Sequence, residues 1–293
     1  MTARSLTPTP ARHVPTRRVS FEYPLGDVPK HFAADEDLVM SHVVAVLSAV
    51  FPPGEDFFVR SVRNFRDQVT DPELEEQVKG FIGQEASHGR EHRELNERFA
   101  ELGYPVRRID DFVDRSLRFR ERVLPPKANL AATAALEHYT ATLAETLLTK
   151  PEARAQIAHD EVRNLFMWHA LEESEHKAVA FDVYRHVGGT ERMRKVTMTV
   201  LNVGFPLFVA VITLLSMLRD PAARRSPRKV WQSIKRLRQS PFIDREVVAR
   251  IRDYNRGDFH PDDHDSEALV ERWRAELFGD AGSLNSRLPA AGR

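Results

Sequence analysis

Apolar residues recur at helical spacing along almost the whole chain, and glycines and prolines gather at the ends of these apolar segments. Signals for strands are nearly absent. The run Asp71-Pro72-Glu73 is typical of a helix start, with Asp as the cap and Pro in the first turn, and Gly103 is typical of a helix end. The pattern predicts an all-α fold.

Four long helices are expected between residues 53 and 187, which is the inventory of a four-helix bundle. An earlier helix is expected to stop at Phe51-Pro52-Pro53-Gly54, because proline disrupts a helix interior. The bundle should occupy residues 21–190, between a disordered arm at 1–20 and later segments that end in a disordered tail at 281–293. The expected helices span residues 37–50, 53–69, 71–103, 111–124, 128–148 and 151–187.

Residues 196–218 contain no charged residue, and a run of this length is long enough to span a membrane. Asn202, Gly204 and Pro206 interrupt the run, and basic residues flank both ends. We therefore favour a helix buried against the bundle or a partner subunit, and the alternative is insertion into a membrane or attachment to its surface. The region 191–280 should pack on the bundle through this helix and two amphipathic ones, at residues 221–240 and 265–277.

Composition narrows the classes of function. Lys plus Arg and Asp plus Glu both number 43, so net charge gives no support for a nucleic-acid partner. The absence of cysteine excludes disulfides, cysteine nucleophiles, iron–sulfur clusters and thiolate zinc sites. Residues 1–20 lack the apolar core of a secretory signal, so we expect a cytoplasmic protein, with membrane association through residues 196–218 as the alternative.

Acids and histidines stand at helical spacing in two segments. Glu85, His88 and His92 lie at positions i, i+3 and i+7 of one helix, and a second segment repeats this mixture with His at both ends. Two helices with such Glu/His pairs, joined by two helices that give one Glu each, hold the metals of di-iron and di-manganese bundles. The candidate ligands are Glu55, Glu85, His88, His92, Glu137, His169, Glu173 and His176. Of these, His92 and His169 are expected either as added ligands or as partners that orient the carboxylates.

Helix register supports the grouping. If the first pair of helices turns near residues 70–72, Glu55 and Glu85 are about equally far from the turn and should meet. The midpoint between Glu137 and Glu173 is residue 155, which requires a longer connection there. Glu137 directly follows an apolar run, and an unpaired carboxylate in such surroundings would be unfavourable, which favours a shared metal site.

Other residues near these motifs have simpler interpretations. A single histidine on an amphipathic helix is usually solvated or part of the core. His138 points away from Glu137, so we expect it either to support the ligand residues from behind or to have a structural role. Glu172 could replace Glu173, because it stands four residues before His176. The acids expected to be solvated neighbours are Glu172 itself, Glu91, Glu94 and Glu175, and residues 259–265 are expected to be a turn and helix cap.

Four strings carry a resemblance to a known family. They run from Pro52 to Phe58, from Gly83 to His88, from Ala135 to Thr140 and from Trp168 to Asp182. With these strings the chain resembles the bacterial family named "predicted metal-dependent hydrolase", which looks related to the ferritin-like superfamily, over about residues 20–280. The resemblance implies a metal-binding helical domain.

The ligand types favour two metal ions over one tetrahedral zinc. With iron, we expect O2-dependent oxidation of a small hydrophobic molecule. The alternative is hydrolysis by metal-activated water, with Mn or Zn. A second alternative is a non-catalytic metal-binding or membrane-associated protein. A homodimer and contact with a membrane surface are further expectations.

Overall fold

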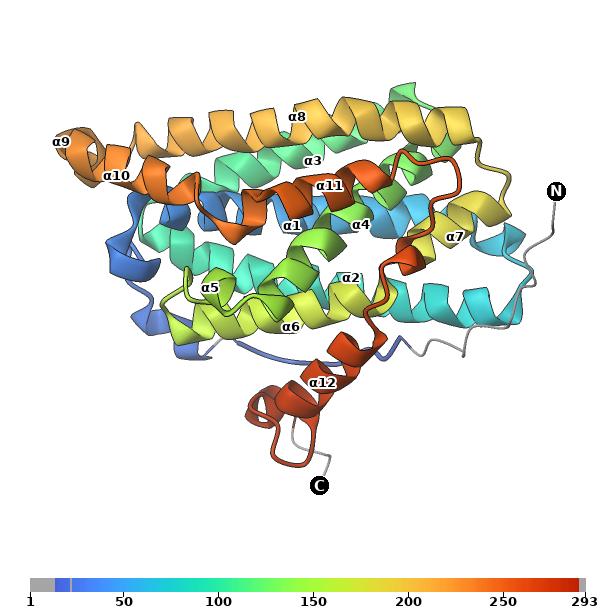
Figure 1. Cartoon of the computed structure of the whole chain (residues 1–293), viewed down its shortest axis with the longest axis horizontal. Helices are drawn as coiled ribbons and strands as arrows, with labels where there is room; N and C mark the ends of the chain where they lie inside the picture. The colour runs from blue at the N-terminus through green and yellow to red at the C-terminus, as the bar shows by residue number, and fades with distance from the viewer. Residues whose placement is uncertain (1–13, 22, 290–293) are drawn as a thin grey trace.

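A computed structural model describes residues 14–21 and 23–289, and this part of the chain is helical, with one isolated β-bridge between Ala33 and Ile157. The predicted all-α class is confirmed (Figure 1). The helices are α1 (Leu38–Arg63), α2 (Pro72–Glu101), α3 (Val106–Val123), α4 (Pro126–Thr149), α5 (Pro151–Arg154), α6 (Asp160–His176), α7 (Val179–His186), α8 (Glu191–Met217), α9 (Pro221–Arg225), α10 (Pro227–Leu237), α11 (Arg245–Asp253) and α12 (Glu267–Phe278), with short 3-10 turns η1 (Tyr23–Asp27), η2 (Ala34–Glu36), η3 (Arg66–Gln68), η4 (Pro241–Ile243), η5 (Pro261–Asp263) and η6 (Asn285–Arg287).

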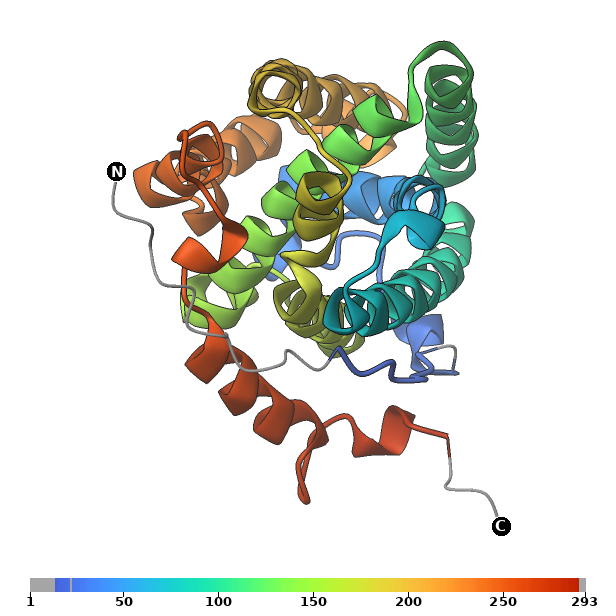
Figure 2. The ribbon, with the colours of Figure 1, turned by 90° about the vertical axis from the view of Figure 1, so that its right-hand side faces the viewer.

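The centre of the molecule is built from α1, α2, α4 and α6. Helix α1 packs on α2 and α4 on α6, while α1 also contacts α4 and α2 contacts α6 (Figure 2). Buried apolar residues form two main clusters along these helices. On α2, for example, Phe81 belongs to one cluster and Leu95 to the other. The residues between them on each helix form a polar layer that is closed off by apolar side chains on both sides.

Helix α1 does not stop where the sequence pattern predicted. It continues through Pro52 and Pro53, which are both buried. Pro52 has no N–H to donate to the carbonyl of Ser48, four residues earlier. Asn96 of α2 compensates, because its Nδ2 donates to the Ser48 carbonyl oxygen at 2.9 Å. The expected break between residues 50 and 53 is therefore wrong.

The single helix expected over residues 151–187 is also wrong, since this segment forms α5, α6 and α7. The interruption after α5 pairs with the chain before α1. Ala34 N–H donates to the Gln156 carbonyl, and His159 N–H donates to the Phe32 carbonyl. Helix α3 likewise begins at Val106 and not at Asp111. The start of α2 is as predicted, because the Asp71 side chain accepts from Glu73 N–H and Leu74 N–H.

Both chain ends differ from the expected disorder where the structure describes them. Val14 and Val19 are buried in the core, as is Leu284 near the other end. Residues 1–13 of the expected arm and 290–293 of the expected tail lie outside the described residues. The described ends are therefore parts of the packed structure.

Helix α8 is continuous from Glu191 to Met217 and passes through Pro206 without a break. Met198 and Met217 are buried on one face, whereas many apolar side chains on the opposite face are exposed. The expectation of a buried helix holds only for the inner face. Within residues 14–21 and 23–289, two helices are long and apolar enough to cross a membrane, the mostly buried Leu38–Gln68 and the mostly exposed α8, and such features alone are weak grounds for a span.

Candidate metal centre

Four glutamates from four helices meet in the polar layer. Glu55 comes from α1, Glu85 from α2, Glu137 from α4 and Glu173 from α6, and each side chain is buried. The register argument therefore predicted their meeting correctly. The longer connection expected between Glu137 and Glu173 corresponds to α5 and the irregular residues after it.

Histidine nitrogens lie between these carboxylates. His176 Nε2 is 3.1 Å from Glu85 Oε1 and 3.3 Å from Glu137 Oε2. His169 Nε2 is 3.0 Å from Glu173 Oε1 and 3.7 Å from Glu55 Oε1. The eight predicted residues fall into overlapping groups of three whose candidate ligand atoms lie within 4.8 Å of one another. The groups are Glu55/His92/His169, His88/His169/Glu173, Glu55/Glu85/His88 and Glu85/Glu137/His176.

Nine buried polar atoms of this cluster have no hydrogen-bond partner in the part of the chain that the structure describes. Buried polar atoms are normally paired, so such a concentration on one spot calls for a missing partner. The atoms are hydrogen-bond acceptors, or ring nitrogens that can be acceptors. Oxygen and nitrogen atoms with free lone pairs are also the atoms that coordinate a metal cation. The nine atoms are both carboxylate oxygens of Glu55, Glu85 and Glu137, together with Glu173 Oε2, His88 Nδ1 and His176 Nε2.

Electrostatics point the same way. Burial, together with neighbouring carboxylates, raises the pKa of Glu55 and of Glu85, and burial and Glu173 raise the pKa of Glu137 to about 7. Burial lowers the pKa of His88 and of His92. Three of the four carboxyl groups therefore disfavour a negative charge unless a cation compensates it, whereas hydrogen bonds with His169 and His176 lower the pKa of Glu173 in spite of its burial.

The tautomer of His176 follows from its surroundings. Gln84 Nε2 donates to Glu175 Oε2 at 2.7 Å and to the Pro15 carbonyl at 3.0 Å, so the Gln84 amide oxygen must face His176. His176 Nδ1 lies 2.8 Å from that oxygen and therefore carries the proton. This leaves the lone pair of Nε2 directed at Glu85 and Glu137.

A longer chain of hydrogen bonds orients His169. Asn96 Nδ2 donates to a backbone carbonyl, so its Oδ1 accepts from Ser48 Oγ at 2.8 Å. Ser48 Oγ then accepts from His92 Nδ1, and His92 Nε2 accepts from His169 Nδ1 at 2.7 Å. The Nε2 lone pair of His169 consequently faces the carboxylates. Of the two roles expected for His92, ligand or orienting partner, this arrangement favours the second, because His92 orients His169.

His88 turns Nδ1 toward the carboxylates, whereas His169 and His176 turn Nε2 toward them. His88 Nε2 lies 3.1 Å from Glu172 Oε2, while the unpartnered Nδ1 is 3.7 Å from Glu173 Oε1. Three histidines thus turn one ring nitrogen each toward the four carboxylates. Glu172 does not replace Glu173, because it lies on the other side of the His88 ring.

Three acids predicted to be solvated are buried, namely Glu91, Glu172 and Glu175. Arg17 explains two of them, since its guanidinium contacts Glu172 at 3.1 Å and Glu175 at 2.7 Å. Glu91 accepts from Phe21 N–H at 2.8 Å. Arg17 lies in the segment that the sequence analysis expected to be a disordered arm, and Phe21 directly follows it. Glu94, by contrast, is exposed as predicted.

Two further predictions outside the cluster agree with the structure. His138 Nε2 donates to the Arg250 carbonyl and packs on Phe259, so it has a structural role. In the turn at residues 259–265, His260 caps η5.

Aromatic side chains close the cluster near His92, where the Phe51 ring lies 4.8 Å from the rings of both His92 and His169. Phe51 is only partly buried, so it separates these histidines from solvent.

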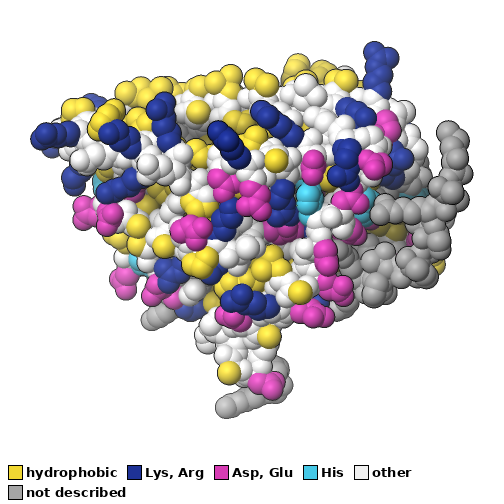
Figure 3. Space-filling view, viewed as in Figure 1, with side chains coloured by type: hydrophobic (Ala, Val, Ile, Leu, Met, Phe, Trp, Pro, Cys, Tyr) yellow, Lys and Arg dark blue, Asp and Glu magenta, His cyan; other side chains and the backbone are white. Residues whose placement is uncertain are grey.

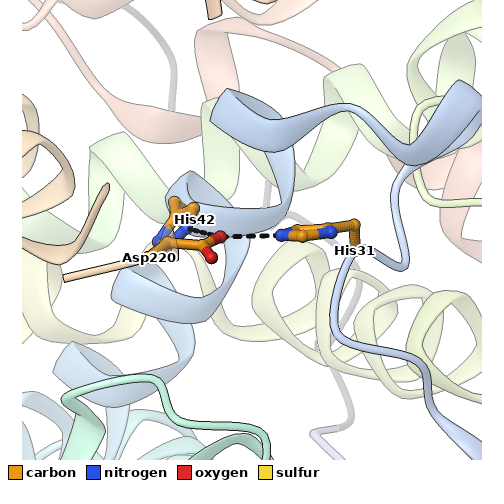
Figure 4. A group of neighbouring side chains, drawn as sticks. All are labelled: His31, His42 and Asp220. Atoms are coloured by element: carbon orange, nitrogen blue, oxygen red, sulfur yellow. Dashed lines mark hydrogen bonds and ion pairs between the residues drawn. The ribbon is translucent and has the colours of Figure 1, made fainter. Parts of the chain in front are cut away.

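A second His/Asp group was not visible in the sequence. His31 Nε2 and His42 Nε2 lie 2.7 Å and 3.1 Å from Asp220 Oδ2 (Figure 4). Lys30 Nζ is 3.2 Å from the other oxygen, which also accepts from Ala222 N–H. Because Asp220 is fully paired and beside an ammonium group, we assign this group to fixing α8 and α9 on α1 and not to a metal.

Comparison with known families decides the relationship. A sequence model of the family described as "predicted metal-dependent hydrolase" matches residues 15–265. The chain belongs to this family. The match confirms the resemblance seen in the four motif strings, and all eight predicted site residues lie within it. Comparison with curated proteins found no match, and comparison with solved structures found none either.

Proposed function

We propose that this member of the family is a hydrolase whose two metal ions are held by the buried Glu/His cluster. The observation that carries the proposal is the set of nine unpartnered oxygen and nitrogen atoms in this cluster. The ligands would be Glu55, Glu85, Glu137 and Glu173 with His88, His169 and His176. When bound, such ions supply Lewis acidity and lower the pKa of water for attack on an ester or phosphoester.

The chain's own residues prepare this chemistry. Gln84 and His92 hold the ring planes of His176 and His169, which keeps one lone pair of each aimed at the carboxylates. Gly89 leaves room beside Glu55, because a Cβ at this position would lie 3.3 Å from Glu55 Oε2. Phe51 limits the entry of water. An apolar substrate suits this aromatic approach.

A second candidate function is O2-dependent oxidation with iron. The observation that favours it is the ligand arrangement, since one Glu from each of two helices plus Glu/His pairs from two others is the arrangement of di-iron bundles. Both functions use the same ligands, so activity must distinguish them.

The test compares metal-loaded and metal-free protein. We expect Zn- or Mn-loaded protein to release p-nitrophenol from apolar p-nitrophenyl esters or from bis-p-nitrophenyl phosphate, and chelation to abolish the release. Glu137→Gln should lose at least about two orders of magnitude of rate, as expected when a metal ligand is removed. Glu76→Gln is the matched control, because the side chain of Glu76 is 75% exposed.

The result that contradicts hydrolysis is equally definite. If the iron-loaded protein consumes O2 with an apolar substrate while no metal form hydrolyses the esters, the oxidation function replaces the proposal. If wild type and Glu137→Gln show the same rate with every substrate, neither function is supported.

A further inference from the structure

We propose that the outer face of α8, together with the basic α9–α10 segment, docks on an anionic lipid surface with α8 lying parallel to that surface. The face is a single stripe along the helix, in which successive members are three or four residues apart. Each member is between 44% and 68% exposed. The exposed stripe consists of Val196, Val200, Val203, Leu207, Val211, Leu214 and Leu218. Figure 3 shows apolar side chains along the edge of the molecule that α8 forms.

Helix α3 widens the apolar surface. Its Phe112 ring stacks on Phe208 of α8, with centroids 6.2 Å apart, so the two helices lie side by side. Phe112 is 52% exposed, Phe119 64% and Val123 56%. These residues form a second stripe next to the first. Contiguous exposed apolar surface of this kind marks an interaction site.

The charge of the segment after α8 indicates which partner binds this apolar surface. Residues 219–239, which follow the stripe, contain eight basic residues and one acid, Asp220, which is buried and paired. Trp231 is 57% exposed, and the Lys235 ammonium lies 3.5 Å from its ring centroid. An apolar stripe beside a basic segment with an exposed tryptophan matches the acyl and headgroup layers of an anionic lipid surface.

The opposite face of α8 shows why the helix lies on the surface and does not span it. Arg194 is fully buried and donates to the carbonyls of Tyr254 and Arg256. Asn202 accepts from Tyr139 Oη at 2.6 Å. Near the other end, Ser216 Oγ lies 2.8 Å from His42 Nδ1, beside the Asp220 group. Insertion across a membrane would break these bonds along the whole length of the helix and leave the polar groups in hydrocarbon.

A second copy of the chain fits this face less well. Arg192 and Lys195 lie at one end of the stripe and Arg219 at the other. Pairing of two stripes brings basic residues together at both ends, in the parallel and in the antiparallel orientation. Like charges disfavour that pairing, whereas anionic headgroups are complementary to both ends.

The experiment is co-sedimentation of the full chain with phosphatidylcholine vesicles, with and without phosphatidylglycerol. We expect binding only to the anionic vesicles, weakened by salt. Leu207→Glu and the pair Arg224→Gln/Arg225→Gln should each weaken binding at least about tenfold, because they remove an apolar contact and headgroup contacts respectively. Ile243→Glu is the control, since Ile243 is 50% exposed but lies in η4, outside the stripe. Circular dichroism verifies that each variant folds.

Three results would overturn the proposal. The first is wild-type protein that stays in the supernatant with anionic vesicles. The second is a dimer that Leu207→Glu dissociates, without vesicle binding. The third is protein that resists extraction from the vesicles by alkaline carbonate, because that resistance indicates a spanning helix.

Discussion

His92 Nε2 lies 2.7 Å from His169 Nδ1, and this contact fixes the nitrogen that His169 turns toward Glu55 and Glu173. His92→Ala removes the acceptor and leaves His169 free to rotate. We expect metal affinity to fall about 10- to 100-fold, the usual effect of losing a group that orients a ligand. His92→Gln supplies an amide oxygen as acceptor and should restore part of the affinity. Metal titration of the two variants checks this, and equal affinity of His92→Ala and wild type would contradict it.

Metal removal should lower thermal stability. Four buried carboxylates repel one another in the metal-free protein, and a ligand that binds only the folded state stabilises it. At free metal about 100 times the Kd the gain is about 2.7 kcal/mol, which corresponds to a shift in melting temperature of several degrees for a chain of this size. Calorimetry with and without chelator measures the shift.

The variant Glu137→Gln separates repulsion from metal binding. Glu137 is fully buried, and Gln removes one charge without removing the side chain. We expect the metal-free variant to unfold at a higher temperature than metal-free wild type, and to gain less from added metal. A metal-free variant that is less stable than metal-free wild type would show that the carboxylates do not repel one another in the folded state.

Stability of the metal-free protein should depend on pH. The pKa of Glu137 is about 7 in the folded protein, against 4.5 for an ordinary glutamate. Between these two values the unfolded chain has released the proton that the folded chain retains, so stability falls as pH rises through this window. Denaturant unfolding in chelator at several pH values should show this decline, and Glu137→Gln should flatten it. Stability that increases over the same range, with Glu137→Gln unchanged from wild type, would contradict the buried-acid account.

Arg17 provides a prediction for the N-terminal segment. It is the guanidinium partner of two buried carboxylates, Glu172 and Glu175, and the pKa of Glu172 is already raised to about 8 by burial. Arg17→Ala leaves these acids with fewer partners and should destabilise the protein by about 3 kcal/mol, the usual effect of breaking a buried pair. Arg18→Ala, at an exposed position, is the control. Equal stability of the two variants would show that the segment contributes nothing to the core.

Helical spacing explains how much of the site could be predicted. Residues three, four and seven apart share one strip of a helix, and this alone places Glu85 beside His88 and Glu173 beside His176. Distance from a turn then brought Glu55 level with Glu85. Such inferences need only the regular rise of a helix, so they agree with the structure.

Features that depend on tertiary partners could not be predicted in this way. The break expected at Pro52 does not occur, because Asn96, more than forty residues away, donates the hydrogen bond to the Ser48 carbonyl that Pro52 cannot donate. Glu172 and Glu175 are buried because Arg17 reaches them across the fold. The contact between His42 and Asp220 joins residues that are 178 positions apart. Local patterns contain no signal for any of these pairings.

The most direct test of the central claim is the number of metal ions per folded chain, measured by elemental analysis after loading with Mn or Zn and removal of free metal. We predict two ions for wild type and for the exposed control Glu76→Gln, and at most one for Glu85→Gln and for His176→Ala, because Glu85 and His176 belong to the same group of candidate ligands. Retention of no metal by folded wild type, or the same metal content in all four proteins, would contradict the assignment of this cluster as a metal centre.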